Sequence, residues 1–191
     1  LYDYADKEIL SVEISNAANV INLYYKKDFN AVKELSYTVE YYKDDVKTDD
    51  SYVERNSSIW IHSDVLPVEN EIIYRNKYEG YTLNRSKSKI VIDGTEWPFS
   101  DTMIPAMGEN IKDGTVIKLY YDRNSQKYTV RYLEEATGKE LAPERTVAEN
   151  VKFGDRITAD TEGVKQTITG YDYVETNPAE LLVGTDNTNN V

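Results

Sequence analysis

The chain of 191 residues contains one six-residue phrase twice. Residues 20–25 read Val-Ile-Asn-Leu-Tyr-Tyr, and residues 116–121 read Val-Ile-Lys-Leu-Tyr-Tyr. Each copy is followed, after a short polar link, by a second shared phrase: Tyr-Thr-Val-Glu-Tyr at residues 37–41 and Tyr-Thr-Val-Arg-Tyr at residues 128–132. Phrases that recur in the same order at long separation indicate a duplicated structural unit. The sequence therefore predicts a tandem array of small modules that is part of something longer.

The repeated phrases also predict where each module begins and ends. We expect residues 1–28 to be the tail of an upstream repeat, with its closing strands. Residues 35–124 are then one module, and residues 126–191 are a second module that lacks its closing strand. The first of these modules is longer because a hairpin is inserted around Asp93 and Gly94, a pair that readily adopts the positive φ angles of a two-residue turn.

This division suggests an exchange of strands between molecules. The tail carries a closing strand without its module, whereas the last module has none. We therefore hypothesise that residues 20–25 pair with the last module of a neighbouring molecule.

Strand signals dominate the chain as short alternating runs bounded by turn residues. The seventeen tyrosines, against three phenylalanines and two tryptophans, suit strands that are buried on one side only. Helical periodicity is weak. Strands are predicted at residues 20–25, 37–42, 59–62, 116–121 and 128–133, and short helices or single helical turns at residues 69–78, 161–165 and 177–182. The predicted fold class is mainly β, as a β-rich α+β chain.

Composition excludes several functions. The chain has no cysteine, so it has neither disulfides nor thiol catalysis. Its net charge of -12 makes nucleic acid an unexpected partner, because binding phosphates requires a basic face. No apolar run approaches the length of a membrane-spanning segment. His62, Ser63 and Asp64 are the residue types of a hydrolytic triad, but neighbours on a strand point to opposite faces, so we do not expect an enzyme.

Aromatic side chains are the candidate ligand contacts, because sugars bind proteins by stacking on aromatic faces. The candidates are Trp60, Trp97, Tyr120 and Tyr121. The alternative for each is a place in the core. In a regular strand, one of two adjacent tyrosines faces outward.

An acidic cluster is the candidate metal site. It comprises Asp44, Asp45, Asp49 and Asp50, on a predicted hairpin loop. Carboxylate oxygens in a flexible loop can hold calcium, although this spacing does not fit an EF-hand. The alternative is a solvated acidic loop, and no other cofactor is expected.

The last module also resembles a known family. The phrase at residues 128–132 is followed by Thr-Gly-Lys-Glu-Leu-Ala-Pro at residues 137–143, by Gly-Asp at residues 154–155 and by Gly-Tyr at residues 170–171. This succession resembles the mucin-binding protein (MucBP) repeat of Gram-positive bacterial surface proteins. The β-grasp repeats of internalin-type surface proteins have a similar sequence texture, but the Glu-Leu-Ala-Pro phrase favours the mucin-binding family. The longer module matches less well, since acidic residues replace that phrase.

The resemblance implies tandem small β-grasp-like modules, arranged end to end, in an extracellular adhesin attached to the cell wall. Its implied partners are host mucin or other glycoprotein glycans. Because a negative chain is repelled by sialic acid and sulfate, we expect binding that is weak per module and strengthened about 10² to 10⁴-fold by avidity. The alternative is a spacer without a ligand of its own, which holds a distal domain away from the cell wall.

Overall fold

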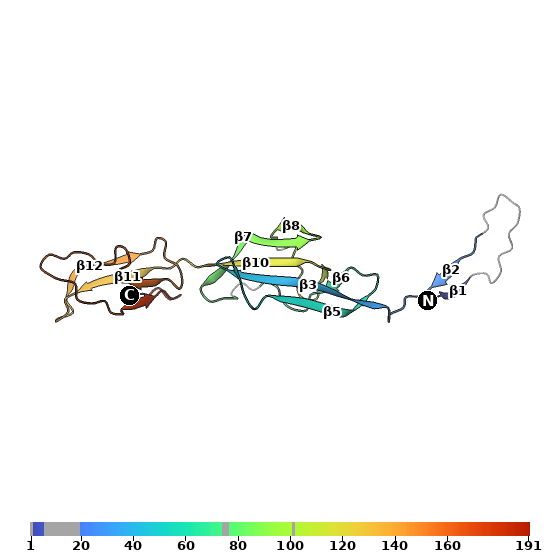
Figure 1. Cartoon of the computed structure of the whole chain (residues 1–191), viewed down its shortest axis with the longest axis horizontal. Helices are drawn as coiled ribbons and strands as arrows, with labels where there is room; N and C mark the ends of the chain where they lie inside the picture. The colour runs from blue at the N-terminus through green and yellow to red at the C-terminus, as the bar shows by residue number, and fades with distance from the viewer. Residues whose placement is uncertain (1, 6–19, 74–76, 101) are drawn as a thin grey trace.

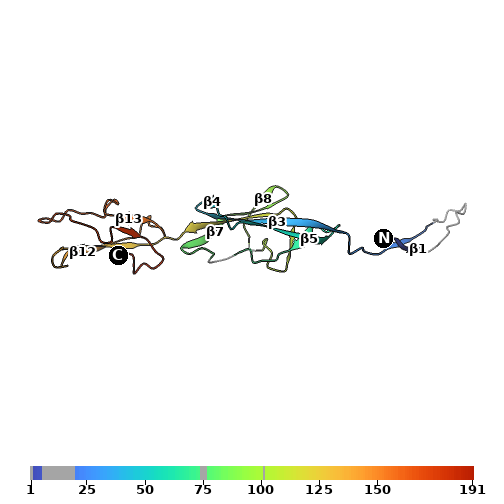
Figure 2. The same cartoon turned by 60° about the horizontal axis from the view of Figure 1, so that its bottom comes forward.

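The computed structural model describes residues 2–5, 20–73, 77–100 and 102–191. These residues form strands, turns and loops without any helix, which confirms that the chain is mainly β. None of them belongs to a helix that could span a membrane. Three parts follow one another along the molecule in Figures 1 and 2, and we name them the N-terminal hairpin (residues 2–5 and 20–25), the central unit (residues 32–123) and the C-terminal unit (residues 128–191).

The central unit is built around one mixed sheet. Its strands are β3 (Val32–Lys43), β4 (Val46–Lys47), β5 (Tyr52–Trp60), β6 (Val65–Pro67), β7 (Tyr81–Ile92), β8 (Thr95–Pro98), β9 (Asn110–Lys112) and β10 (Val116–Arg123). The sheet order is β4-β3-β10-β7-β8, and β5 also pairs with β3. β3 and β10 lie parallel at the centre, whereas the other pairs in this sheet are antiparallel. β6 and β9 form a separate antiparallel pair.

One face of this sheet is buried because its strands alternate apolar and polar residues. Six side chains of the two central strands are each exposed by 1% or less, and they are Tyr37, Val39 and Tyr41 from β3 and Ile117, Leu119 and Tyr121 from β10. Leu66 of β6 and Ile72 of the loop that follows it belong to the core on this face. The alternate residues of β3 and β10 point to the opposite side, which we call the outer face.

The C-terminal unit repeats part of this arrangement. Its strands are β11 (Tyr128–Leu133), β12 (Glu140–Val147), β13 (Arg156–Thr158) and β14 (Glu180–Leu182). β11 and β12 pair antiparallel, as β3 and β5 do, and β13 pairs with β14 as β6 pairs with β9. Its buried hydrophobic cluster consists of Tyr128, Val151, Val164 and Val183, whereas the described part of the central unit has thirteen such residues.

The helical predictions are wrong where the structure describes them. Residues 69–73 form a loop with a single bend, residues 77–80 bend and turn, and residues 74–76 lie outside the described chain. Residues 161–165 form one hydrogen-bonded turn. β14 lies where a helical turn was predicted at residues 177–182, because Leu181 pairs with Ile157 and packs on the C-terminal core. Tertiary pairing outweighs the local signal of Pro178.

Strand and turn predictions hold better. The predicted strands at residues 37–42, 116–121 and 128–133 lie within β3, β10 and β11. In the inserted hairpin, Asp93 and Gly94 both have positive φ, at 51° and 74°, between β7 and β8. The strand predicted at residues 59–62 ends at Trp60, where the chain turns.

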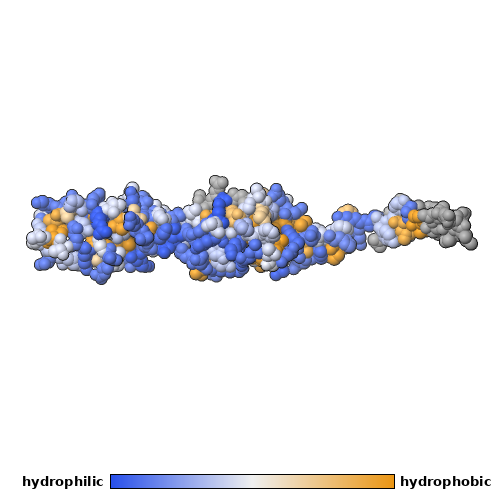
Figure 3. Space-filling model, turned by 90° about the horizontal axis from the view of Figure 1, so that it is seen from above, coloured by the Kyte–Doolittle hydropathy of each residue, from blue (hydrophilic) through white to orange (hydrophobic). Residues whose placement is uncertain are grey.

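The N-terminal hairpin consists of β1 (Tyr2–Ala5) and β2 (Leu23–Tyr25), paired antiparallel. In this single chain β2 therefore pairs with its own N-terminal segment, which does not support the hypothesis that residues 20–25 pair with a neighbouring molecule. The side chains of β2 are all exposed. In the view of Figure 3, apolar residues gather at this narrow end, whereas the two larger units present a mostly hydrophilic surface.

Candidate functional site

A stacked pair of tyrosines lies on the outer face of the central sheet. Tyr42 of β3 and Tyr120 of β10 face each other across the parallel pair, with ring centroids 4.5 Å apart and planes 12° from parallel. Both are partly exposed. Tyr121, the next residue, is fully buried in the core, so of the two predicted tyrosines only Tyr120 can meet a ligand.

Hydrogen bonds fix the tyrosine pair in place. The Tyr42 hydroxyl donates to Glu40 over 2.8 Å, and the Lys47 ammonium donates to the same carboxylate over 2.6 Å. Burial and the bond to Glu40 raise the pKa of Tyr42 to about 12, so its ring stays neutral at physiological pH. Burial alone would raise the pKa of Glu40, but the bonds from Lys47 and Tyr42 outweigh it and lower that pKa.

Paired charges surround the tyrosines on the same face. Glu96 of β8 accepts from Lys89 of β7 over 2.7 Å, and it lies 3.8 Å from the ammonium of Lys118 of β10. Exposed ion pairs of this kind each contribute little to stability. Because the charges neutralise one another, the outer face presents aromatic surface among balanced charges rather than a strong field of one sign.

The two tryptophans lie elsewhere. Trp97 is 47% exposed, and it faces Ile90 across the β7–β8 pair, on the side of the sheet that carries the core. Trp60 pairs with Val32 at the start of β3, roughly 30 Å of extended strand away from Tyr42. The structure therefore does not bring the predicted aromatic residues together.

Trp60 has its own surroundings. The Lys27 ammonium lies 4.0 Å from the centroid of its ring, and the His62 ring lies 4.8 Å away. The hydroxyl of Ser63 donates to the carbonyl of Val65. His62 and Ser63 thus have separate partners, and their geometry is not that of a triad.

The four predicted calcium ligands lie on two turns. Asp44 and Asp45 form the turn between β3 and β4, where both have positive φ. A carboxylate oxygen of Asp44 lies 3.3 Å from Arg123, and Asp45 lies 3.1 Å from the ammonium of Lys87. These two carboxylates therefore have different basic partners.

Asp49 and Asp50 lie on the next turn, before β5. Asp50 lies 2.9 Å from the Lys77 ammonium and accepts a 2.8 Å bond from the Tyr78 hydroxyl. Burial raises the pKa of Asp50, but the hydrogen bonds that it accepts outweigh burial and lower the pKa to about 2. Nowhere in the described chain do three acidic, histidine or cysteine side chains gather as metal ligands. A calcium ion at these turns would have to compete with the ion pairs.

The junction between the central and C-terminal units is the arrangement that sequence reasoning missed. Arg123, at the end of β10, lies 2.7 Å from Asp155 of the C-terminal unit, and its Nε lies 3.3 Å from Asp44 of the central unit. The same guanidinium donates to the carbonyl of Phe153 over 3.3 Å. One cation therefore bridges acidic groups of both units.

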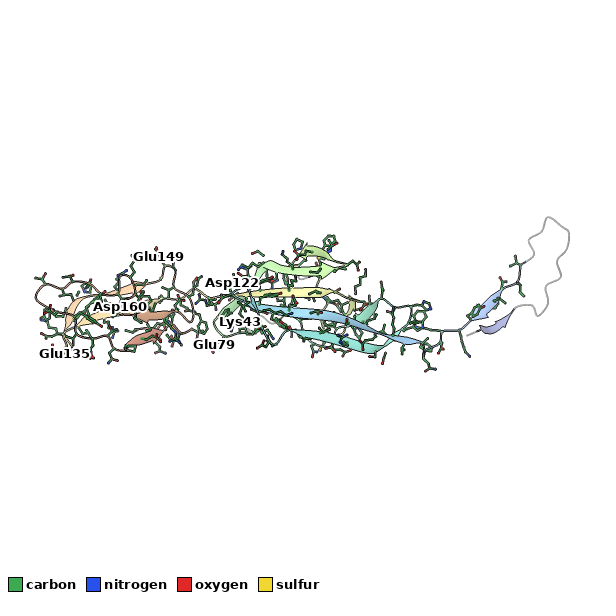
Figure 4. The ribbon with its side chains drawn as sticks, in the orientation of Figure 1. Lys43, Glu79, Asp122, Glu135, Glu149 and Asp160 are labelled. Atoms are coloured by element: carbon green, nitrogen blue, oxygen red, sulfur yellow. The ribbon has the colours of Figure 1, made fainter. Side chains whose placement is uncertain are left out.

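An aromatic ring closes the other side of the junction. Phe153 packs edge-on against Tyr81, with centroids 6.0 Å apart. Its ring also covers Gly80, whose φ is +73° and where an added Cβ would meet the ring at 2.2 Å. Only glycine fits this position without displacing Phe153. Figure 4 shows Lys43, Glu79 and Asp122 at the end of the central unit that faces this junction.

The link between the units, residues 124–127, is hydrogen-bonded on both sides. Asn124 donates its N–H to the carbonyl of Gly80 over 2.8 Å and accepts from the N–H of Phe153 over 3.0 Å. Further along, the N–H of Gln126 donates to Val151 over 3.0 Å. Such a link is part of the folded structure rather than a flexible tether.

Searches among models of known protein families, among curated proteins and among solved structures found no match to this chain.

Proposed function

We propose that the chain is a segment of an extended stalk on a bacterial surface protein, in which β-grasp-like modules are joined end to end by stiff junctions. The observation that carries this proposal is the junction at Arg123 and Phe153, because it fixes both sides of a short link. A stalk needs such junctions, since flexible links would let its far end collapse towards the cell.

The sheet order supports the β-grasp-like part of the proposal. In the central unit the first long strand, β3, and the last, β10, are the parallel pair at the centre, and hairpin partners flank them on both sides. The C-terminal unit repeats the β3–β5 and β6–β9 pairings in the same order. The resemblance of residues 126–191 to mucin-binding repeats suggests the cell-surface setting.

The stiffness of the junction can be measured with two spin labels. Because the chain has no cysteine, Thr95→Cys and Glu140→Cys provide the only labelling sites, one exposed position on each unit. We expect a narrow distribution of label distances in the otherwise unchanged chain, and clearly broader distributions with Arg123→Ala or Phe153→Ala. Arg55→Ala, which removes an exposed ion pair on β5, is the matched control and should leave the distribution narrow. A broad distribution before any substitution would contradict the proposal.

A second candidate function is weak binding of glycans, as in an adhesin that recognises host mucin. It is favoured by the exposed ring of Trp97 and by the tyrosine pair at Tyr120, since sugars stack on such faces. Mucin binding should then fall with Trp60→Ala, Trp97→Ala or Tyr120→Ala but not with Tyr171→Ala, an exposed tyrosine of the C-terminal unit. Binding no higher than background would favour a stalk without a ligand.

A further inference from the structure

The chain enters and leaves the central unit through its two central strands. β3 begins at Val32, at the end of the unit that faces the N-terminal hairpin, and β10 ends at Arg123, at the junction with the C-terminal unit (Figures 1 and 2). Because the two strands are parallel, a pull along the long axis of the molecule draws β3 in one direction and β10 in the other. The pull therefore acts to slide the two strands past each other.

Backbone hydrogen bonds join the two strands over a long register. Six consecutive residue pairs connect them. At the start of this register the N–H of Thr38 donates to the carbonyl of Thr115 over 2.9 Å, and after its end the N–H of Asp44 donates to the carbonyl of Tyr121 over 3.2 Å. The bonds of a parallel pair are evenly spaced along the strands. A sliding pull therefore stretches them together, whereas separation from one end breaks them one after another.

Side chains oppose sliding on both faces of the pair. On the core side Tyr41 lies beside Leu119, and both are exposed by 1% or less. On the outer face Tyr42 stacks on Tyr120, with ring centroids 4.5 Å apart. A shift of one residue along the pair would place core-facing side chains opposite outward-facing ones. Intermediate registers are therefore unfavourable, and the strands stay paired until the whole register is lost.

Neither strand lies at an edge of the sheet. β5 pairs with β3 on the side away from β10, and β7 pairs with β10 on the side away from β3. Separation of β3 from β10 therefore divides the sheet at its centre and opens the core. The segment between the two strands, residues 44–115, bears the pull only after that separation.

We propose that the pair of β3 and β10 is a mechanical clamp that keeps the central unit folded when the molecule is stretched. The clamp resists the pull in shear, because its hydrogen bonds and side-chain contacts must all be lost together. This inference rests on the proposed stalk function, since a stalk transmits force between its two ends. It predicts that the resistance of the unit depends on the direction of the pull and not only on the stability of the fold.

The test is single-molecule stretching of the full chain between two alternative pairs of attachment sites. The chain has no cysteine, so Asn30→Cys and Lys127→Cys, both at exposed positions, attach the handles before β3 and after β10 and load the clamp in shear. Val46→Cys with Lys127→Cys instead attaches both handles at one end of the clamp, where the strands are peeled apart.

We expect the force that unfolds the central unit to be at least about twofold higher in shear than in peeling. Both labelled chains should unfold at the same urea concentration, because all three attachment sites are on the surface. Equal forces in the two geometries, or a lower force in shear, would overturn the proposal. This comparison needs no substitution within the clamp.

A substitution on the outer face tests whether the pair itself sets the force. Tyr120→Ala removes the stack on Tyr42 from the clamp. The matched control is Val53→Ala on β5, because Val53 pairs with Thr38 on the same face but lies outside the clamp. We expect Tyr120→Ala to reduce the ratio of the shear force to the peeling force and Val53→Ala to leave it unchanged. Equal effects of the two variants on this ratio would contradict the proposal.

The stretching experiment is separate from the spin-label test of the junction. Equal forces together with a narrow distribution of label distances would overturn the clamp and leave the stiff junction standing. A higher force in shear together with a broad distribution would support the clamp as a property of the central unit, while contradicting the proposed stalk.

Discussion

The central and C-terminal units begin with almost the same strand but bury it to different degrees. β3 and β11 share the Tyr-Thr-Val-x-Tyr phrase, and each pairs with an antiparallel partner on one side. Among the strands that the structure describes, β3 has a parallel neighbour and β11 does not; this neighbour is β10, and its side chains Ile117, Leu119 and Tyr121 are completely buried. The phrase therefore accompanies the same antiparallel pairing in both units, whereas the larger core is found where a second strand lies on the other edge.

In both units the last tyrosine of the shared phrase donates a hydrogen bond to a carbonyl of a loop. The Tyr41 hydroxyl donates to the carbonyl of Ile72 over 3.2 Å, and the equivalent Tyr132 hydroxyl donates to the carbonyl of Val164 over 3.1 Å. Both units therefore have this hydrogen bond, although Tyr132 is less buried than Tyr41. A comparison of Tyr41 with Tyr132 therefore separates the effect of burial on stability from that of hydrogen bonding.

The largest expected effect comes from weakening the parallel strand. Leu119→Ala should lower the free energy of unfolding of the central unit by about 2–5 kcal/mol, because Leu119 is completely buried. Both tryptophans lie in this unit, so urea unfolding followed by tryptophan fluorescence measures it selectively. A loss below about 1 kcal/mol would mean that the core tolerates a cavity beneath the parallel pair.

The second largest effect is a difference in stability cost between equivalent valines on the first strands of the two units. Val39→Ala should cost about 2 kcal/mol, since the side chain is fully buried, whereas Val130→Ala should cost about half as much. NMR signals assigned to each unit during urea unfolding give both values. Equal costs would show that the C-terminal core is as complete as the central one.

Removal of the paired tyrosine hydroxyls should have a smaller effect. Tyr41→Phe should destabilise the central unit by about 1 kcal/mol, because it leaves the carbonyl of Ile72 without its donor inside the core. Tyr132→Phe should cost less, because water can reach the more exposed site. The same urea experiment measures both, and the reverse order would contradict the role given to burial.

The smallest expected effect is on the pH dependence of the free energy of unfolding. The pKa of Asp50 is about 2 in the folded chain against an ordinary value of 3.8, so the unfolded chain binds more protons between these values. The stability contributed by this group is therefore complete above about pH 4 and is lost as the pH falls towards 2. Asp50→Asn should flatten the unfolding profile in that window, although solvent weakens the effect because the side chain is 45% exposed.

Asp160 of the C-terminal unit is the matched control. A hydrogen bond from Lys165 lowers the pKa of its carboxylate, which is almost fully exposed. Asp160→Asn should therefore leave the acid profile nearly unchanged. If both substitutions flatten the profile equally, exposure does not decide the contribution of these carboxylates.

The sequence predicted those parts of the fold that depend on local pattern. Alternation of residues predicted β3, β10 and β11, and the positive φ angles of Asp93 and Gly94 follow from their residue types. Alternation also predicted that one of two adjacent tyrosines faces outward, as Tyr120 does while Tyr121 is buried. The residues of a strand that are buried can be predicted from the alternation within that strand, without reference to distant segments.

Features that depend on distant segments were not predictable in this way. Arg123, Phe153 and Gly80 meet at the junction although they lie far apart in the sequence, and no periodicity connects them. The place of Asn190 beside Thr129 is likewise a matter of tertiary pairing. For the same reason Asp44, Asp45 and Asp50 belong to one acidic cluster in the sequence but have separate basic partners in the structure.

The hydrogen-bonded link at residues 124–127 has a geometric consequence. Because it is tied to the central unit through Gly80 and to the C-terminal unit through Val151, its length sets how far one unit is rotated about the long axis relative to the next. If such units were repeated with the same link, the rotation would recur at each step, and equivalent faces of the units would follow a helical path around the long axis. Inserting a single residue into the link would change that pitch while leaving each unit intact.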